Sequence, residues 1–250
     1  MATGRPIFFT GLAAPAAERF TGLAAPAAER SAVKVSRARN LLGIVLLLQP
    51  FAAVVAIAAD LPPALELPRP KLDSPATLVS ALKARRSARE FSPAPLSAQA
   101  LSDLLWAANG VSRDDGRRTA PSAKNWQEID VYAVLPGGAY VYDAKAHALR
   151  GVAKGDLRAA TGVQDFVAAA PLNLVYVADF SRMSGASGGD RDLYAAADAA
   201  FVSENVYLWC AATGLSTVVR GSVDRPALAK ALGLRPDQRI LLAQSVGMPK

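Results

Sequence analysis

Residues 118–135 have the sequence RTAPSAKNWQEIDVYAVL, in which a polar loop runs directly into a strand. The second half, 129–135, alternates around Val131 with β-branched and aromatic side chains, a pattern typical of a strand. The first half is rich in small hydroxyl and amide side chains, and an amide offers a paired donor and acceptor that match the edge of a heterocycle. The stretch therefore predicts a strand that begins at a candidate ligand loop, with an ordinary capping loop as the alternative.

The flanking sequence predicts helices and strands in an irregular order. Ser97 is a suitable N-cap residue for the helix that follows it, and Asn109-Gly110 is a suitable end for that helix. Because the elements are interspersed without strict alternation, the pattern predicts an α+β fold with a layered sheet. We expect helices at 77–85, 97–109, 193–213 and 225–232, and strands at 129–135, 139–142, 173–178, 217–219 and 240–246.

The expected helix over 193–213 is apolar on most of its sides. A helix that is hydrophobic all round has to be buried on all sides. We therefore expect a second copy of the chain to cover part of this helix, which predicts a homodimer.

Residues 85–91, RRSAREF, place three arginines and a serine in five positions after a predicted helix end. The guanidinium group binds phosphate through two parallel hydrogen bonds, and a hydroxyl adds a further donor. The run therefore indicates an anion site, with a solvated basic helix end as the alternative.

A third segment, 214–222, has the sequence GLSTVVRGS and follows the apolar helix. Glycine there would allow the backbone to approach a ligand closely. The sequence contains no phosphate-binding Walker loop and no GxGxxG fingerprint after a strand.

Together these three segments resemble the nitroreductase superfamily of flavin enzymes, over about residues 77–249. The RRSxRxF run is similar to that family's motif for the phosphate and ribityl chain of FMN. The PSAxNxQ run is similar to its second motif, and the helix with its Gly-Leu and glycine turn to its third. Within the superfamily, the chain looks most like the SagB-type dehydrogenase branch and exported nitroreductase-like proteins.

The resemblance implies a layered fold with a central mixed, mostly antiparallel sheet flanked by helices, and a homodimer with each FMN between two subunits. It also implies FMN as the cofactor and NAD(P)H as a candidate electron donor. One basic group, from Arg89 or Lys124, would lie near the N1 edge of the flavin. The implied cofactor-binding residues are Arg85, Arg86, Ser87 and Arg89 at the phosphate and ribityl chain, Pro121, Ser122, Lys124, Asn125 and Gln127 in the second motif, and Arg220 and Gly221 beside the flavin ring. Ser122 and Asn125 would hydrogen-bond the flavin ring or ribityl chain, in this family often from the partner subunit.

The implied activity is that of an FMN-dependent oxidoreductase that passes two electrons from a donor to a small organic acceptor, nitro- or quinone-like, by a ping-pong mechanism. The flavin carries this chemistry, so no catalytic side chain is expected. One alternative is an exported flavin-binding protein without turnover, and another is a flavin-dependent dehydrogenase of azoline rings in peptides. Many family members complete the phosphate site with a basic C-terminal arm, for which this sequence offers only Arg239 and Lys250.

The chain contains one cysteine, Cys210, and one histidine, His147. A single cysteine excludes an intrachain disulfide and a cysteine-rich metal site. Its apolar surroundings indicate an inert core thiol. His147 is expected in a turn between strands rather than in a catalytic triad or a metal site.

The first 75 residues predict a leader rather than a folded domain. Residues 1–32 contain the eleven-residue repeat FTGLAAPAAER twice and are of low complexity, and a true start at Val33 or Val35 is a further hypothesis. Residues 33–58 combine a basic stretch, an uncharged apolar stretch and an A-x-A site, which is typical of a signal peptide. We expect cleavage near Ala58/Ala59 and a periplasmic or secreted protein, with a retained membrane anchor as the alternative.

Residues 59–75 are rich in proline and predict an extended linker or an arm over the surface, rather than a helix. The flavin domain would then occupy 76–250, with the folded body beginning near Ser74. The formal net charge of the chain is +7, and the first 58 residues, with six basic and two acidic side chains, supply more than half of it. The remainder is only mildly basic and has no long Lys/Arg run, so we expect no nucleic-acid partner.

Overall fold

The computed structural model describes residues 61–73 and 76–250. The predicted signal peptide, its cleavage site and the tandem repeat lie outside the described residues. Within them, no helix combines the length and the apolar character that crossing a membrane requires.

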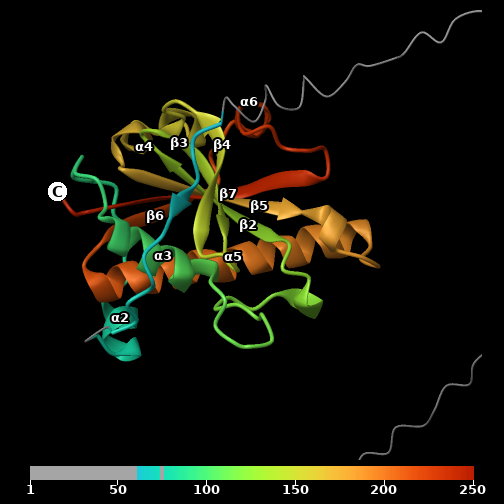
Figure 1. Ribbon diagram of the computed structural model, residues 1–250, viewed down its shortest axis with the longest axis horizontal. Helices are drawn as coiled ribbons and strands as arrows, with labels where there is room; N and C mark the ends of the chain where they lie inside the picture. Colours follow the sequence, from blue (N-terminus) through green and yellow to red (C-terminus); the bar gives the residue numbers. More distant parts are fainter. Residues whose placement is uncertain (1–60, 74–75) are drawn as a thin grey trace, which may run out of the picture. The chain divides into compact units, whose positions relative to one another are not determined.

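A seven-stranded sheet in the order β1-β4-β3-β2-β5-β7-β6 forms the centre of the fold (Figure 1). Each strand pairing of the described chain is antiparallel, without the parallel pair that a mixed sheet would include. The α+β prediction is confirmed. The strands are β1 Leu65–Glu66, β2 Ile129–Leu135, β3 Gly138–Asp143, β4 Ala148–Lys154, β5 Leu172–Asp179, β6 Ser216–Arg220 and β7 Gln238–Gly247.

The helices α2, α3, α5 and α6 begin at residues whose side chains accept a backbone N–H. Ser97 accepts the N–H of Ala100 at the start of α3, as its position in the sequence predicts. The long helix α5 begins five residues earlier than expected, because Ser187 caps it ahead of two glycines that hide the start. The helices are α2 Leu78–Ala84, α3 Ala98–Asn109, α4 Phe166–Ala169, α5 Gly188–Thr213 and α6 Arg225–Ala231, with short 3-10 turns η1 Ala123–Asn125, η2 Arg158–Thr161 and η3 Phe180–Arg182.

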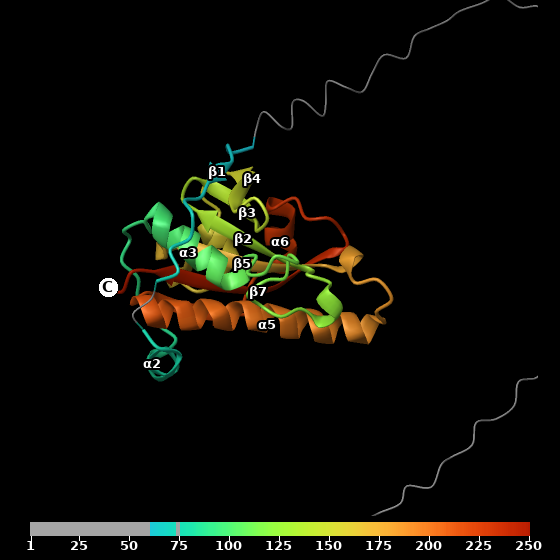
Figure 2. The same cartoon turned by 60° about the horizontal axis from the view of Figure 1, so that its bottom comes forward.

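Both faces of the sheet are covered. On one face, α3 and α5 pack against the sheet, and α6 packs against the other (Figure 2). The central strand β5 shows the two faces directly, because Leu174 and Tyr176 face α3 and α5, whereas Val175 and Val177 face α6. All eight residues of β5 are buried, which agrees with its nearly continuous apolar sequence.

Helix α5 is buried along one stripe and not on all sides. Val202, Val206 and Cys210, at helical spacing, face the sheet and are at most 2% exposed. On the opposite side, Leu193 is 65% exposed and Phe201 is 46% exposed. The single chain therefore leaves an apolar face of α5 open, and its cover by a second copy stays a prediction.

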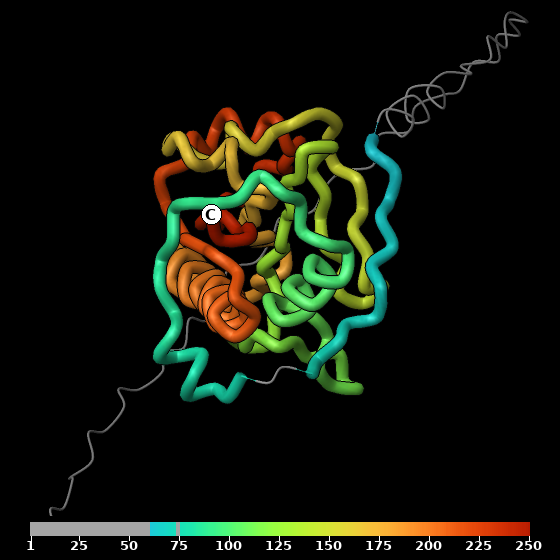
Figure 3. The backbone as a smooth tube through the Cα atoms, turned by 90° about the vertical axis from the view of Figure 1, so that its left-hand side faces the viewer, coloured from blue at the N-terminus to red at the C-terminus, as the bar shows by residue number. Residues whose placement is uncertain are grey.

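The folded part of the chain begins before Ser74. Residues 61–73 run along the outside of the sheet (Figure 3), and β1 within them pairs with β4. Pro62 lies against β4 at Gly151, where a Cβ atom would collide with the Pro62 carbonyl oxygen. We call residues 61–73 the N-terminal arm.

His147 joins the N-terminal arm to the sheet. It lies in the turn between β3 and β4, as predicted. The hydroxyl of Ser102 donates to the Pro68 carbonyl at 2.5 Å, so its contact with His147 Nε2 at 2.7 Å requires the imidazole to donate. Tyr142 then donates to Nδ1 at 2.8 Å. Burial lowers the pKa of His147, and the neutral ring serves a structural role.

Candidate functional site

The loop before β2 is held in an unusual backbone conformation. Lys124, Asn125 and Gln127 all have positive φ, at 49°, 56° and 50°. Non-glycine residues rarely adopt such angles, and they persist only where surrounding contacts enforce them. The contacts come from the Ser122 hydroxyl, which accepts the Gln127 N–H at 2.8 Å, and from a carboxyl oxygen of Asp198, which accepts the Ala123 N–H at 2.8 Å.

A cavity of about 500 Å³ opens beside this loop. Its floor comes from α5, through Asp198 and Val202, and its rim includes Arg113 and Arg117. Five residues that the sequence predicts as cofactor contacts line it: Pro121, Ser122, Lys124, Asn125 and Gln127.

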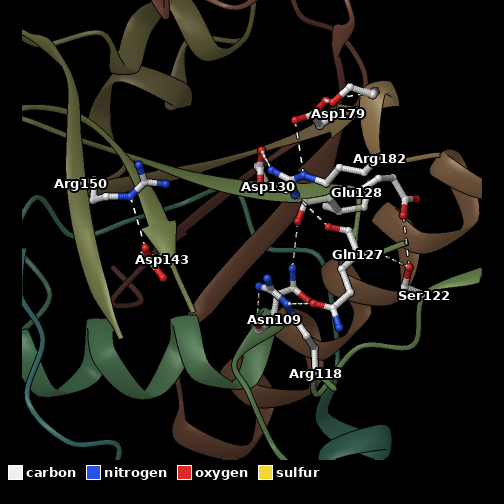
Figure 4. Close-up of polar contacts among 12 residues, drawn as sticks. Asn109, Arg118, Ser122, Gln127, Glu128, Asp130, Asp143, Arg150, Asp179 and Arg182 are labelled. Atoms are coloured by element: carbon white, nitrogen blue, oxygen red, sulfur yellow. Dashed lines mark hydrogen bonds and ion pairs between the residues drawn. The ribbon is translucent and has the colours of Figure 1, made fainter. Parts of the chain in front are cut away.

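Arg118 fixes the amide side of the cavity, as Figure 4 shows. Its Nε donates to Gln127 Oε1 at 3.0 Å, and its Nη1 donates to the Asn109 carbonyl at 3.2 Å. The Gln127 amide in turn donates to Asn125 Oδ1 at 3.0 Å. Burial lowers the pKa of Arg118, the nearby Asp130 opposes that shift, and the guanidinium remains charged at the wall of the cavity.

Two acidic residues that the sequence analysis missed lie beneath the loop. Glu128 is 0% exposed, and its Oε2 accepts the Ser122 hydroxyl at 3.2 Å (Figure 4). Asp198 is 3% exposed, in the middle of α5. Burial raises the pKa of Glu128 to about 7, and the adjacent Asp198 carboxyl adds to the rise. The one signal in the sequence is an isolated carboxylate inside the alanine-rich part of α5.

Neutral contacts anchor the arginine run 85–89, and they leave its guanidinium groups free of any charged partner among the described residues. Ala88 N–H donates to the Thr217 carbonyl at 2.9 Å, and the Ser87 and Tyr207 hydroxyls lie 2.7 Å apart. The Arg85 guanidinium stacks over the Tyr207 ring at 5.3 Å. No guanidinium of the run forms an ion pair with another described residue. The exposed members of the run are Arg85, Arg86, Ser87 and Arg89.

Arg220 lies in the interior and not at the surface of a cavity. It is 7% exposed, and its two Nη atoms donate to Ser245, Thr161 and Asn173 at 2.9–3.1 Å. Burial lowers the pKa of Arg220 to about 10. Its neighbour Gly221 is exposed, and no atom lies closer than 4.0 Å to the position that a Cβ would occupy.

The predicted site residues therefore fall into three groups within one chain. Residues 121–127 line the large cavity, and the arginine run does not. Arg86 lines a separate and smaller cavity of about 120 Å³ beside α5 and β6. Arg220 belongs to the core.

The lone cysteine of the chain lies in the hydrophobic core of the described residues. Cys210 is fully buried, and burial raises the pKa of its thiol. The residues that the structure describes contain no cluster of three His, Cys, Asp or Glu side chains that could hold a metal ion.

Comparison with known proteins identifies relatives of this arrangement. The profile of the nitroreductase family matches residues 82–248. A relative named as a candidate nitroreductase, MJ1384 of Methanocaldococcus jannaschii, is 31% identical over 148 residues, which cover 55% of this chain and 75% of the relative.

Solved structures agree with the profile. A candidate nitroreductase from Ralstonia eutropha JMP134 is 44% identical, with a TM-score of 0.72 over 76% of this chain and 90% of that one. The NADPH:FMN oxidoreductase of Vibrio harveyi, complexed with NAD+, shares the fold at 20% identity, with a TM-score of 0.53 over 69% of each chain. On the matched profile and these relatives, the chain belongs to the nitroreductase family.

Proposed function

We propose that the protein is an FMN-dependent oxidoreductase that passes two electrons from a reduced nicotinamide, or another donor, to a small organic acceptor. The observation that carries the proposal is the anchored arginine run, whose unpaired guanidinium groups suit a phosphate ester. Family membership supports the same cofactor. FMN, when bound, would supply the hydride chemistry, and the chain would supply binding and electrostatics.

The residues of this chain fit such a group in two places. Arg85, Arg86 and Arg89, with the Ser87 hydroxyl, would hold the phosphate and ribityl chain. The exposed backbone at Gly221 leaves room for close approach, as its open Cβ position indicates. The amides of Asn125 and Gln127 and the charge of Lys124 line a cavity of a size that suits a flat heterocycle.

We propose further that the working site forms between two copies of the chain. The arginine run and the 121–127 loop do not line the same cavity within one copy. The exposed apolar face of α5, including Leu193 and Phe201, supplies a surface that a second copy would cover. The partner's loop would then meet the arginine run.

The acceptor would be nitro- or quinone-like and would use the same cavity after the oxidised donor leaves, in a ping-pong sequence. Membership of the SagB-type branch is part of this proposal. The decisive experiment is a visible spectrum of the purified protein, followed by stopped-flow mixing with NADH and NADPH. A flavin band that either nicotinamide bleaches supports the oxidoreductase. A flavin band that neither nicotinamide bleaches points to a flavin-binding protein without turnover. Absence of a flavin band contradicts the proposal.

Replacing Arg85 tests the phosphate contact. A charge-assisted hydrogen bond contributes about 1.5–3 kcal/mol, so Arg85→Ala is expected to weaken FMN binding by roughly tenfold or more. Flavin fluorescence titration of the apoprotein measures the Kd. Arg69→Ala, at an exposed position of the N-terminal arm that lines neither cavity, serves as a charge-matched control. An unchanged affinity in Arg85→Ala would remove this residue from the site.

We propose export through the signal peptide of residues 33–58, which places the mature protein in the periplasm or outside the cell. The mature N-terminus is expected at Ala59 or within a residue or two of it. Intact-mass spectrometry of the protein from its native cell checks this directly. An intact leader in the membrane fraction would instead indicate a retained anchor.

A further inference from the structure

Two carboxyl groups lie beside each other beneath the cavity loop, and both are almost fully buried. Glu128 immediately precedes β2 and is 0% exposed, and Asp198 lies on α5 and is 3% exposed. Glu128 Oε1 is buried and has no donor among the described residues. Two ionised carboxylates in such a place would repel each other and would both lack hydration.

One proton shared between Glu128 and Asp198 explains which atoms donate and which accept in the hydrogen bonds around the two carboxyl groups. Ser122 Oγ accepts the Gln127 N–H, so its own proton goes to Glu128 Oε2. Asp198 Oδ2 accepts the Ala123 N–H. A proton on Glu128 Oε1, donated to Asp198, satisfies the otherwise unpartnered atom and leaves Oε2 as the acceptor for Ser122.

We propose that Glu128 is a positioning residue of the cavity: its carboxyl shares one proton with Asp198, and the pair holds the 122–127 loop in its left-handed conformation. The Ser122 proton is directed inward, so the hydroxyl presents only a lone pair to the cavity. At this point the cavity therefore selects a ligand group that donates a hydrogen bond, such as a ring N–H or a hydroxyl. The role in flavin binding rests on the proposed function, whereas the shared proton does not.

Charged side chains on the neighbouring elements are engaged elsewhere. Lys124 lies over the Trp126 ring at 5.0 Å, and Arg118 donates to neutral acceptors. Arg182 from η3 pairs with Asp130 at 2.9 Å, and both Arg182 and Arg235 pair with Asp179, the last residue of β5. Asp198 is the charged group whose proximity adds to the raised pKa of Glu128.

The raised pKa of Glu128 agrees with a proton shared with Asp198, and it defines the pH range over which the stability of the folded state should change. Glu128 ionises near its ordinary value of 4.5 in the unfolded chain and near 7 in the folded one. Between these values the unfolded state releases a proton that the folded state keeps. The stability of the folded state therefore falls as pH rises through the window, and it levels off above the upper value.

The test compares three variants with the natural chain. E128Q keeps the network, because its amide can donate to Asp198 and accept from Ser122. E128L cannot do either, and E204Q alters an exposed carboxyl of α5 as the matched control. Urea unfolding of the apoprotein is measured from about pH 4 to about pH 9, together with the infrared band of a protonated buried carboxylic acid.

The natural chain and E204Q are expected to lose stability as pH rises from about 4.5 to about 7, and to show the acid band below that upper value. E128Q is expected to lack the band and the part of the slope that Glu128 contributes. The same slope in E128Q, or no acid band in the natural chain, would overturn the shared proton, whether or not the protein holds flavin.

Flavin titration then tests the positioning role. E128L is expected to bind FMN about tenfold more weakly at about pH 6, through loss of the loop conformation, and E128Q is expected to restore the affinity. Equal affinity in E128L and the natural chain would overturn positioning. Should E128L fail to fold, a weakening of FMN affinity in the natural chain above pH 7 that is absent in E128Q decides the same point. If the natural chain binds no flavin, that result contradicts the proposed function. The urea unfolding and infrared measurements on the apoprotein still test the shared proton.

Discussion

Val206→Asp is expected to leave the protein largely unfolded, whereas Phe201→Asp on the same helix is expected to leave each chain folded. Val206 is 0% exposed and packs in the core between α5 and the sheet. An unpaired carboxylate there costs about 4 kcal/mol or more, a large part of the roughly 5–15 kcal/mol that stabilises a typical domain. Far-ultraviolet circular dichroism with urea titration measures the loss.

Phe201 is 46% exposed in the single chain, so a charge there has water as a neighbour. The expected effect of Phe201→Asp is confined to assembly. Light scattering should give a monomer, and the amount of bound flavin should decrease because the proposed site needs two copies of the chain. The pair of variants thus separates the core of the chain from its proposed interface. A Phe201→Asp dimer with full flavin occupancy would contradict the placement of the interface on this face of α5.

Arg220→Met is expected to cost about 2–4 kcal/mol of stability. The guanidinium donates to acceptors of Thr161, Asn173 and Ser245 in the interior, and methionine would remove these hydrogen bonds, although Asn173 Oδ1 would keep the Ser245 hydroxyl as a donor. Arg89→Met, at an exposed position, is expected to stay within about 0.5 kcal/mol of the natural chain. Urea unfolding of the two apoproteins gives the comparison. Equal stability of the two variants would show that Arg220 is not part of the scaffold.

Local signals in the sequence account for much of the fold. The cap at Ser97, the Gly-Gly turn before β3 and the apolar run of β5 each predict their element, since a short peptide carries the whole pattern. β4 was missed as a strand because its residues mix glycine, lysine and arginine with apolar side chains. The pairing of β1 with β4 was missed because it joins segments more than 80 residues apart and leaves no local pattern.

The residues of the candidate site also divide into those that the sequence predicts and those that only tertiary packing brings together. The residues of the 121–127 loop are adjacent in sequence, so their common place beside one cavity could be predicted. Glu128 and Asp198 are 70 positions apart, and only tertiary packing brings them together. Arg220 shows the opposite error: a polar residue beside a glycine turn suggested a ligand, whereas the strand directs its side chain into the core.

Under the proposed export, the docked N-terminal arm has a consequence for the order of events. Pro62 rests against Gly138 and Gly151, so the chain is already fixed there. Under the proposed cleavage after Ala58, only residues 59–61 separate the scissile bond from Pro62, and fully extended they span about 10 Å. A peptidase needs an extended, accessible substrate on both sides of the bond. Processing would therefore have to precede docking of the arm, and a copy that folded completely before translocation would resist maturation.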